Sequence, residues 1–114
     1  SSAQLSLRFD PSTADKFEQF HRDNPQVYST LVRLAREWIN KTGRRKIGIG
    51  ALTERARWEL AIETNDPEYR INNDYRAYFA RLIMAENPDL TDVFDLRASE
   101  ADEWIGSYLT KAAS

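Results

Sequence analysis

Apolar residues recur at intervals of three and four along most of this 114-residue chain, which is the spacing of amphipathic helices. Residues 14–22 follow this spacing and stop before Asn24-Pro25, so we predict a short first helix. The spacing resumes from Pro25 to Thr42, with asparagine as a suitable N-cap before the proline and Gly43 as a C-terminal stop. The first part of the chain therefore predicts two helices joined at a proline.

A third helix is predicted from Ala51 to about Glu63, and its apolar residues lie on more than one side. One side is formed by Leu52, Ala56 and Leu60. Trp58 and Ile62 lie on another side. A helix that is apolar all round is usually buried all round, so we expect this helix to be central.

The clearest amphipathic pattern follows a turn cluster at residues 64–67. Its apolar positions are Tyr75, Tyr78, Phe79, Leu82 and Ile83. Asn73 is the expected cap of this fourth helix, and Asn87-Pro88 ends it. Residues 90–96 predict a short helical turn. A last helix begins after Ser99, which with Asp102 resembles a capping box.

These elements predict a mainly α fold, a compact bundle of four principal helices plus one or two short helices. Ile47 and Ile49 alternate with other residues, as do residues 69–72, so a small two-stranded β-ribbon is left open. We expect residues 1–114 to form a single helical domain, with residues 1–13 as an extended or flexible N-terminal segment.

Composition narrows the classes of protein further. The chain has no cysteine and a single histidine, His21, which excludes disulfides, zinc ribbons, thiol nucleophiles and multi-histidine metal sites. No apolar run approaches the roughly 18 residues of a membrane span. Glycine-rich phosphate loops and serine-nucleophile motifs are absent too. We therefore expect a cytoplasmic protein with no catalysis, no cofactor, no metal and no membrane contact.

Charge is unevenly distributed, although the net charge is only −2. Residues 33–57, the basic block, hold eight basic residues and two acids; residues 86–103, the acidic block, hold seven acids and one arginine. A basic block is typical of nucleic-acid surfaces, and an acidic block can dock on a basic partner. The two blocks could also pair within one fold, or between copies in a homo-oligomer.

The basic block centres on a junction between two predicted helices, KTGRRKIGIGALTERARW. Several cations on one face could hold a phosphate backbone. A helix-turn-helix element is also compatible, with Thr53, Arg55 and Arg57 offered to a groove. The predicted contacts are Lys41, Arg44, Arg45, Lys46, Arg55 and Arg57. The alternative is structural, because cations stabilise a helix C-terminus and Arg55 can pair with Glu59.

A second polar cluster, Asn72, Asn73 and Arg76, stands at the start of the predicted fourth helix. Free backbone N–H groups there favour an anion, asparagine can read adenine, and arginine can hold a phosphate. We add these three residues to the predicted nucleic-acid contacts. Asparagine is also a common cap and turn residue, so a purely structural role stays open.

The acidic block could mimic a phosphate backbone or dock on a basic protein partner. Asp92 and Asp102 near predicted helix starts could equally serve as caps. If this block folds over Arg44 to Lys46, it would partly neutralise the predicted phosphate site and weaken binding.

Three stretches resemble a family of small proteins encoded by bacteriophages and prophages: NPQVYSTLVRLA, ALTERARWELAIET and YRINNDYRAYFARLIMAENP. The family pattern has an NP-x-V-Y helix, an ERIRWE-like helix and an INNNYRAYYAR-like helix. Ala56 stands in place of a larger aliphatic residue, and Asp74 in place of asparagine. The resemblance covers roughly residues 17–88. It implies a phage or prophage origin, and hence the cytoplasm of a host bacterial cell, and supplies no catalytic residue.

Two functions follow as hypotheses. The leading one is a small nucleic-acid-binding regulatory or accessory protein that uses the basic helix junction. The alternative is a module that binds a host or phage protein, as a modulator or inhibitor, through an apolar helix face. The aromatic residues available to such a face are Trp58, Tyr75, Tyr78, Trp104 and Tyr108. Exposure of these rings in the fold would support the protein-binding hypothesis, and full burial would remove it.

Overall fold

The structure, a computed structural model, describes residues 12–113, which form five α-helices and two short 3-10 helices. In chain order these are α2 (Thr13–Asp23), α3 (Pro25–Thr42), α4 (Ile49–Thr64), η1 (Asn73–Tyr75), α5 (Arg76–Glu86), η2 (Pro88–Leu90) and α6 (Ala101–Ala113). The predicted mainly α bundle is confirmed. The expected N-terminal segment, residues 1–13, falls outside the described residues except for its last two, and Thr13 already begins α2.

Local chemistry explains where the helices begin and end. The Ser12 hydroxyl caps α2 by accepting from the backbone N–H of Asp15 at 3.2 Å. Gly43 closes α3 with φ of 72°, a left-handed conformation that glycine adopts without strain. Asn65 closes α4 in the same region, at φ 57°. The turn signals in the sequence therefore mark the ends of α3 and α4 correctly.

The last helix begins with the capping box that the sequence indicates. The Asp102 carboxylate accepts from the backbone N–H of Ser99 at 2.9 Å. The Ser99 hydroxyl in turn accepts from the backbone N–H of Ala101 at 3.1 Å. Two N–H groups at this helix start are thus satisfied by side chains.

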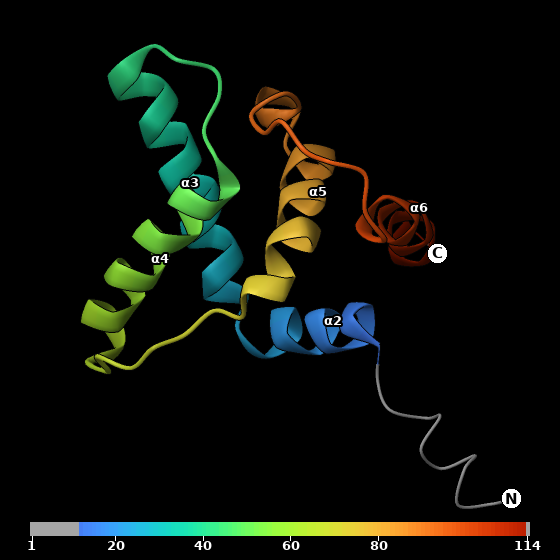
Figure 1. The fold of residues 1–114 in the computed structure, drawn as a ribbon, viewed down its shortest axis with the longest axis horizontal. Coiled ribbons are helices and arrows are strands. Elements are labelled where there is room, and N and C mark those ends of the chain that lie inside the picture. The colour runs from blue at the N-terminus through green and yellow to red at the C-terminus, as the bar shows by residue number, and fades with distance from the viewer. Residues whose placement is uncertain (1–11, 114) are drawn as a thin grey trace, which may run out of the picture.

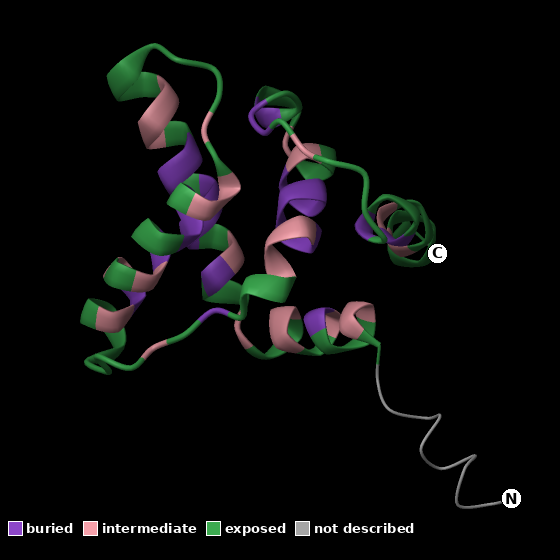
Figure 2. Cartoon of the chain, viewed as in Figure 1, coloured by how far each residue is buried: buried purple, intermediate pink, exposed green. Residues whose placement is uncertain are grey.

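α5 is the central helix of the fold (Figure 1). It lies between the α3–α4 pair on one side and α6 on the other, with α2 across its N-terminal end. Six consecutive residues of α5, Tyr78 to Ile83, are buried (Figure 2). Apolar side chains from all five described helices join in one cluster around it, including Phe17 of α2, Leu31 of α3 and Trp104 of α6.

The expectation that the helix after residue 50 is central is wrong. α4 lies at the edge of the fold (Figure 1), and only the side that carries Leu52, Ala56 and Leu60 faces the core. Its other apolar residues, Trp58 and Ile62, are 60% and 62% exposed. The apolar pattern on two sides reflects one covered face and one open face.

The two-stranded ribbon left open by the sequence is not formed, since no strand occurs among residues 12–113. The segment before α4 is held by a different neighbour. Its Ile47 backbone N–H donates to the carbonyl of Val93 at 3.0 Å, so this part of the chain lies against the loop after η2. Residues 65–72 instead form a connection that packs Ile71, 1% exposed, into the core.

Candidate functional site

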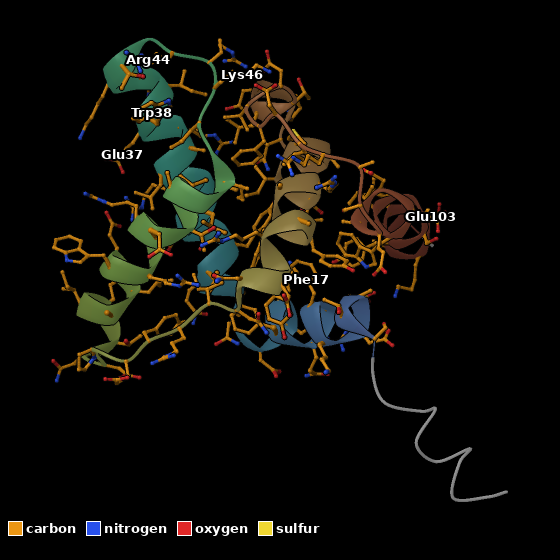
Figure 3. The ribbon with its side chains drawn as sticks, viewed as in Figure 1. Phe17, Glu37, Trp38, Arg44, Lys46 and Glu103 are labelled. Carbon is orange, nitrogen blue, oxygen red and sulfur yellow. The ribbon has the colours of Figure 1, made fainter. Side chains whose placement is uncertain are left out.

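The acidic block folds over the basic junction, which we define as Arg44, Arg45 and Lys46. The Arg45 guanidinium donates to Asp92 at 2.6 Å and to the backbone carbonyl of Asp89 at 2.9 Å. Lys46 donates to Asp95 at 2.9 Å. Figure 3 shows Arg44 and Lys46 at the end of the molecule where α3 runs into α4. The two charge blocks therefore pair inside one chain.

A third contact extends this pairing onto α3. Arg36 donates to both carboxylate oxygens of Asp89, at 2.9 and 3.2 Å, and to the side chain of Asn87 at 3.2 Å. These hydrogen bonds lower the pKa of Asp89, and the bond from Arg45 lowers the pKa of Asp92. Both carboxylates are therefore charged partners of the cations throughout the neutral pH range.

The remaining cations at the end of α3 differ in their surroundings. Lys41 lies 3.3 Å from Glu37, which also accepts from Arg33 at 2.6 Å. The side chain of Arg44 is exposed, and no described residue bonds to it. Arg44 is therefore the one member of the basic junction that can meet a phosphate without first leaving a carboxylate.

The helix-turn-helix interpretation does not fit the side chains of α4. Thr53 is only 1% exposed and its hydroxyl donates to the carbonyl of Ile49, so it cannot reach a groove. Arg55 is exposed but lies 3.5 Å from Glu59, which also accepts from Arg33 of α3. The predicted Arg55–Glu59 pair is present, as the structural alternative required.

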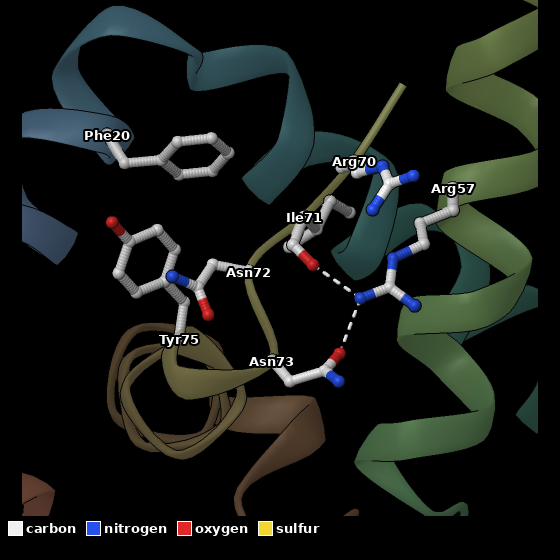
Figure 4. Close-up of a pocket in the computed structure, with 7 residues that line it drawn as sticks. All are labelled: Phe20, Arg57, Arg70, Ile71, Asn72, Asn73 and Tyr75. Carbon is white, nitrogen blue, oxygen red and sulfur yellow. Dashed lines mark hydrogen bonds between the residues drawn. The ribbon is translucent and has the colours of Figure 1, made fainter. Parts of the chain in front are cut away.

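Arg57 lies on another side of α4, where it joins the helix to residues 71–73. Its Nη2 donates to the carbonyl of Ile71 and to the side-chain oxygen of Asn73 (Figure 4), and its Nη1 donates to Glu54. Glu54 also accepts from Arg76 at 3.2 Å. The fold thus brings Arg57, Asn73 and Arg76 together, away from the basic junction.

An open depression lies beside this network, and we call it the 70–75 depression. It has a volume of about 720 Å³. Its side chains are Phe20, Arg57, Arg70, Asn72, Asn73 and Tyr75, with Ile71 between them. Figure 4 shows Phe20 and Tyr75 on one side of the backbone of residues 71–73 and the two arginines on the other. The predicted residues Arg57, Asn72 and Asn73 meet here, whereas Phe20 and Arg70 were not among the predicted contacts.

A second surface runs along the outside of α4, and we call it the α4 outer face: Ala51, Arg55, Trp58 and Ile62. Trp58 and Ile62 stand one helical turn apart. The Arg55 guanidinium lies over the Trp58 ring, 5.3 Å from its centroid. Trp58 and Ile62 are the two most exposed large apolar side chains among residues 12–113.

A groove of about 310 Å³ between α3 and α4 adjoins this face and shares Ala51 and Arg55 with it. Leu34, Trp38 and Ile47 give the groove an apolar wall. The Trp38 indole N–H donates to the carbonyl of Lys46 at 2.9 Å, so its ring is held in place with its polar group satisfied.

The other aromatic candidates are covered. Tyr78 is 4% exposed and Trp104 is 8% exposed. Tyr75 and Tyr108 are half-buried and pack against the core cluster. Trp58 alone of the five lies open to solvent.

His21 packs against the core. Its ring stacks on Phe17, with ring centroids 5.9 Å apart. Burial lowers the pKa of His21, and the nearby Glu86 charge opposes that effect. No group of three or more histidine or acidic side chains in the described part of the chain could hold a metal ion.

Sequence reasoning missed Arg81, the one buried cation among residues 12–113. Its Nε donates to Asp102 at 3.0 Å, and its Nη2 donates to the carbonyl of Arg97 at 2.6 Å. The side chain is 7% exposed and joins α5 to the start of α6. Its place among the apolar positions of the fourth predicted helix was the only signal in the sequence.

None of the described helices is both long and apolar enough to cross a membrane. Comparisons with known proteins gave no match to a family model, to a curated protein or to a solved structure.

Proposed function

We propose that this protein is a non-catalytic interaction module that binds an acidic, amphipathic segment of another protein along the α4 outer face. One observation carries the proposal: Trp58 and Ile62 are 60% and 62% exposed on a helix whose opposite side is in the core. Single exposed apolar residues are common, but two large ones in contact range beside an apolar groove are typical of a binding surface.

The energetic argument rests on the same two side chains. Burying an exposed tryptophan or isoleucine contributes about 1.5–3 kcal/mol each. Tryptophan is among the residues that most often dominate a protein interface. Arg55 already lies over the Trp58 ring, which limits the ring's freedom and reduces the entropy lost on binding.

The charges at the groove indicate the chemistry of the partner. Lys41 and Arg55 are 77% and 61% exposed at its rim, and each has only a long ion pair, with Glu37 at 3.3 Å and with Glu59 at 3.5 Å. The only acid among its lining residues is Glu37, which already holds Lys41 and Arg33. A partner helix with apolar residues one turn apart and acids beside them would match this surface in both shape and charge.

Nucleic-acid binding through the basic junction becomes the weaker of the two hypotheses. Its premise was a set of uncompensated cations, and Arg36, Arg45 and Lys46 are each paired with an acid. Exposed ion pairs contribute only about 0–1 kcal/mol each, so phosphates could replace these acids at modest cost. The hypothesis stays a prediction.

The resemblance to phage and prophage proteins supports a host or phage protein as the partner. The absence of cysteine is compatible with a reducing cytoplasm, and the same resemblance points to a bacterial cell.

The test uses a displayed library of random helical peptides of about 14 residues, selected against the full chain. We expect enriched peptides to carry apolar residues one turn apart with flanking Asp or Glu. Ile62→Ala should weaken their binding about tenfold, whereas Leu109→Ala, which truncates the exposed leucine of α6, should leave it unchanged. Selection of peptides that bind both variants equally, or failure to enrich any, would refute the proposal.

Sedimentation of the wild type and of Trp58→Ala addresses the competing occupant, a second copy of this chain. We expect both to be monomers at micromolar concentration. A wild-type dimer that Trp58→Ala dissociates would show that the α4 outer face is a homodimer interface, and the proposed foreign partner would then be wrong.

A further inference from the structure

The 70–75 depression offers hydrogen-bond donors and no carboxylate. Arg57 and Arg70 both line it, and none of its lining residues is an acid. The Arg70 side chain is 83% exposed, and its only partner among the described residues is Glu68 at 3.5 Å, a weak contact that leaves the guanidinium free to turn. Because Glu54 already pairs with Arg57, the weakly paired Arg70 is the cation at which a ligand's negative charge would contribute most.

The two asparagines add donors whose direction is set by their other contacts. The Asn72 side-chain oxygen accepts from the backbone N–H of Asp74 at 2.9 Å. The Asn73 side-chain oxygen accepts from Arg57. Both amide groups therefore use their oxygens inside the protein, and both NH₂ groups are left to donate outward.

Arg57 is the fixed element of the site. Its terminal nitrogens are held by Glu54, Ile71 and Asn73, yet its buried Nε has no partner among the described residues. That nitrogen is closed to solvent, so a ligand would meet the 23% of the Arg57 side chain that is exposed.

The opposite side of the depression is aromatic. Phe20 of α2 and Tyr75 of η1 lie with ring centroids 5.1 Å apart, and both are half-buried (Figure 4). The two rings are tilted by 39° to each other, so a planar ring can lie against one of them and meet the edge of the other. Aromatic rings beside cations are the combination with which proteins bind single nucleotide units.

We propose that the 70–75 depression binds a nucleoside phosphate, with its base against Phe20 and Tyr75 and its phosphate at Arg57 and Arg70. The NH₂ groups of Asn72 and Asn73 would donate to acceptors of the base or sugar. The ligand is either a free nucleotide or one unit of a single-stranded nucleic acid, because both present the same chemistry. This site is separate from the α4 outer face and does not depend on the function proposed for it.

Titrations followed by amide NMR spectra of the full chain test this proposal. The probes are adenosine monophosphate, adenosine, inorganic phosphate and an oligothymidylate of about eight nucleotides. We expect adenosine monophosphate to shift signals of residues that line the depression, and adenosine and phosphate to bind more weakly than the nucleotide. Phosphate that binds as well as the nucleotide would overturn the role of the aromatic rings. No binding of either nucleotide probe would overturn the whole proposal.

Arg70→Ala is the decisive variant, because its exposed side chain contributes little to the fold. We expect it to weaken nucleotide binding about fivefold. Arg44→Ala makes the same charge change at the basic junction and should have no effect; equal effects of the two variants would refute the site.

The aromatic wall is tested by Phe20→Leu, which should lower the affinity for the nucleotide and leave phosphate binding unchanged. If this variant fails to fold, the ligand series on the wild type still decides the question. Tighter binding of the oligothymidylate than of the mononucleotide identifies nucleic acid as the source of the ligand, and the reverse order identifies a free nucleotide.

Discussion

Arg45 and Asp92 are bonded at 2.6 Å, although they lie 47 positions apart in the chain. Lys46 and Asp95 repeat the arrangement at 2.9 Å. Two blocks of opposite charge in the sequence therefore become neighbouring partners in the fold, and the surface presented to a nucleic acid is less positive than residues 33–57 alone indicate.

Removing the acids that cover the basic junction should reveal its affinity for DNA. We expect Asp92→Asn combined with Asp95→Asn to bind a DNA duplex about tenfold more tightly than the wild type at about 50 mM salt, and to lose that gain at about 200 mM. Fluorescence anisotropy measures both affinities. Glu100→Gln combined with Glu103→Gln removes the same charge near α6, and an equal gain from this control would mean that net charge alone is responsible.

Arg57 should contribute more to stability than Arg55, its neighbour on α4. Arg57 is 23% exposed and donates to a backbone carbonyl, so Arg57→Ala leaves Ile71 with an unpaired acceptor. We expect a loss of about 1–3 kcal/mol in the free energy of unfolding, against less than about 0.5 kcal/mol for Arg55→Ala. Urea denaturation with an unchanged slope provides the comparison. Equal losses would show that the hydrogen bonds from Arg57 to Ile71 and Asn73 add no stability beyond that of an exposed ion pair.

His21 should make the fold less stable as the pH falls below neutrality. Burial lowers its pKa in the folded state, so the unfolded chain binds the proton more readily. The stability that this neutral histidine contributes is present above its ordinary pKa of about 6.5 and is lost as the pH falls through the lower folded value. The slope for one proton cannot exceed about 1.4 kcal/mol per pH unit.

The measurement is the free energy of unfolding between about pH 7.5 and pH 5, a window above the range where carboxylates titrate. His21→Phe should flatten the curve in this window. Glu86→Gln removes the opposing charge and should steepen it. A wild-type curve that is already flat would contradict the prediction.

Replacing each of two glycines by alanine should change the stability of the fold in opposite directions. Gly106 lies inside α6, and a methyl group added at its Cα would find open space within 4 Å, so Gly106→Ala should stabilise the fold by about 0.5–1 kcal/mol. Gly43 has φ of 72°, and Gly43→Ala should destabilise it by about 1 kcal/mol despite equally open space. Thermal unfolding of both variants compares the two effects. Loss of stability in both would indicate a cost unrelated to backbone conformation.

Helix positions could be predicted because their signals are local. Asn24-Pro25 ends one helix and begins the next, and Gly43 ends the second helix, whatever lies elsewhere in the fold. Whether a helix face is buried depends on residues far away in the sequence. The pattern of α4 shows two apolar sides, but Trp58 is buried only if another element covers its side of the helix. The last helix, α6, packs on α5 instead.

The candidate surfaces show the same division. The run of like charges in the sequence identified Arg45 and Lys46 as candidate contacts. Their partners in the fold are carboxylates of the distant residues 89–95, which the local sequence does not reveal. Asn72 and Asn73 were identified from their polar cluster. Phe20 could not be, because it joins that cluster only when α2 folds against the connection after α4. Arg70 stands two positions before Asn72, but residues 69–72 were interpreted as part of a possible ribbon.

The order of the two charge blocks matters while the chain is being made. Synthesis proceeds from the N-terminus, so residues 33–57 leave the ribosome before residues 89–95. During that interval Arg45 and Lys46 have no carboxylate to hold, and the unfinished chain is an unshielded cation beside ribosomal RNA. Asp92 and Asp95 emerge later, and their pairing with Arg45 and Lys46 then reduces the positive charge of this part of the chain.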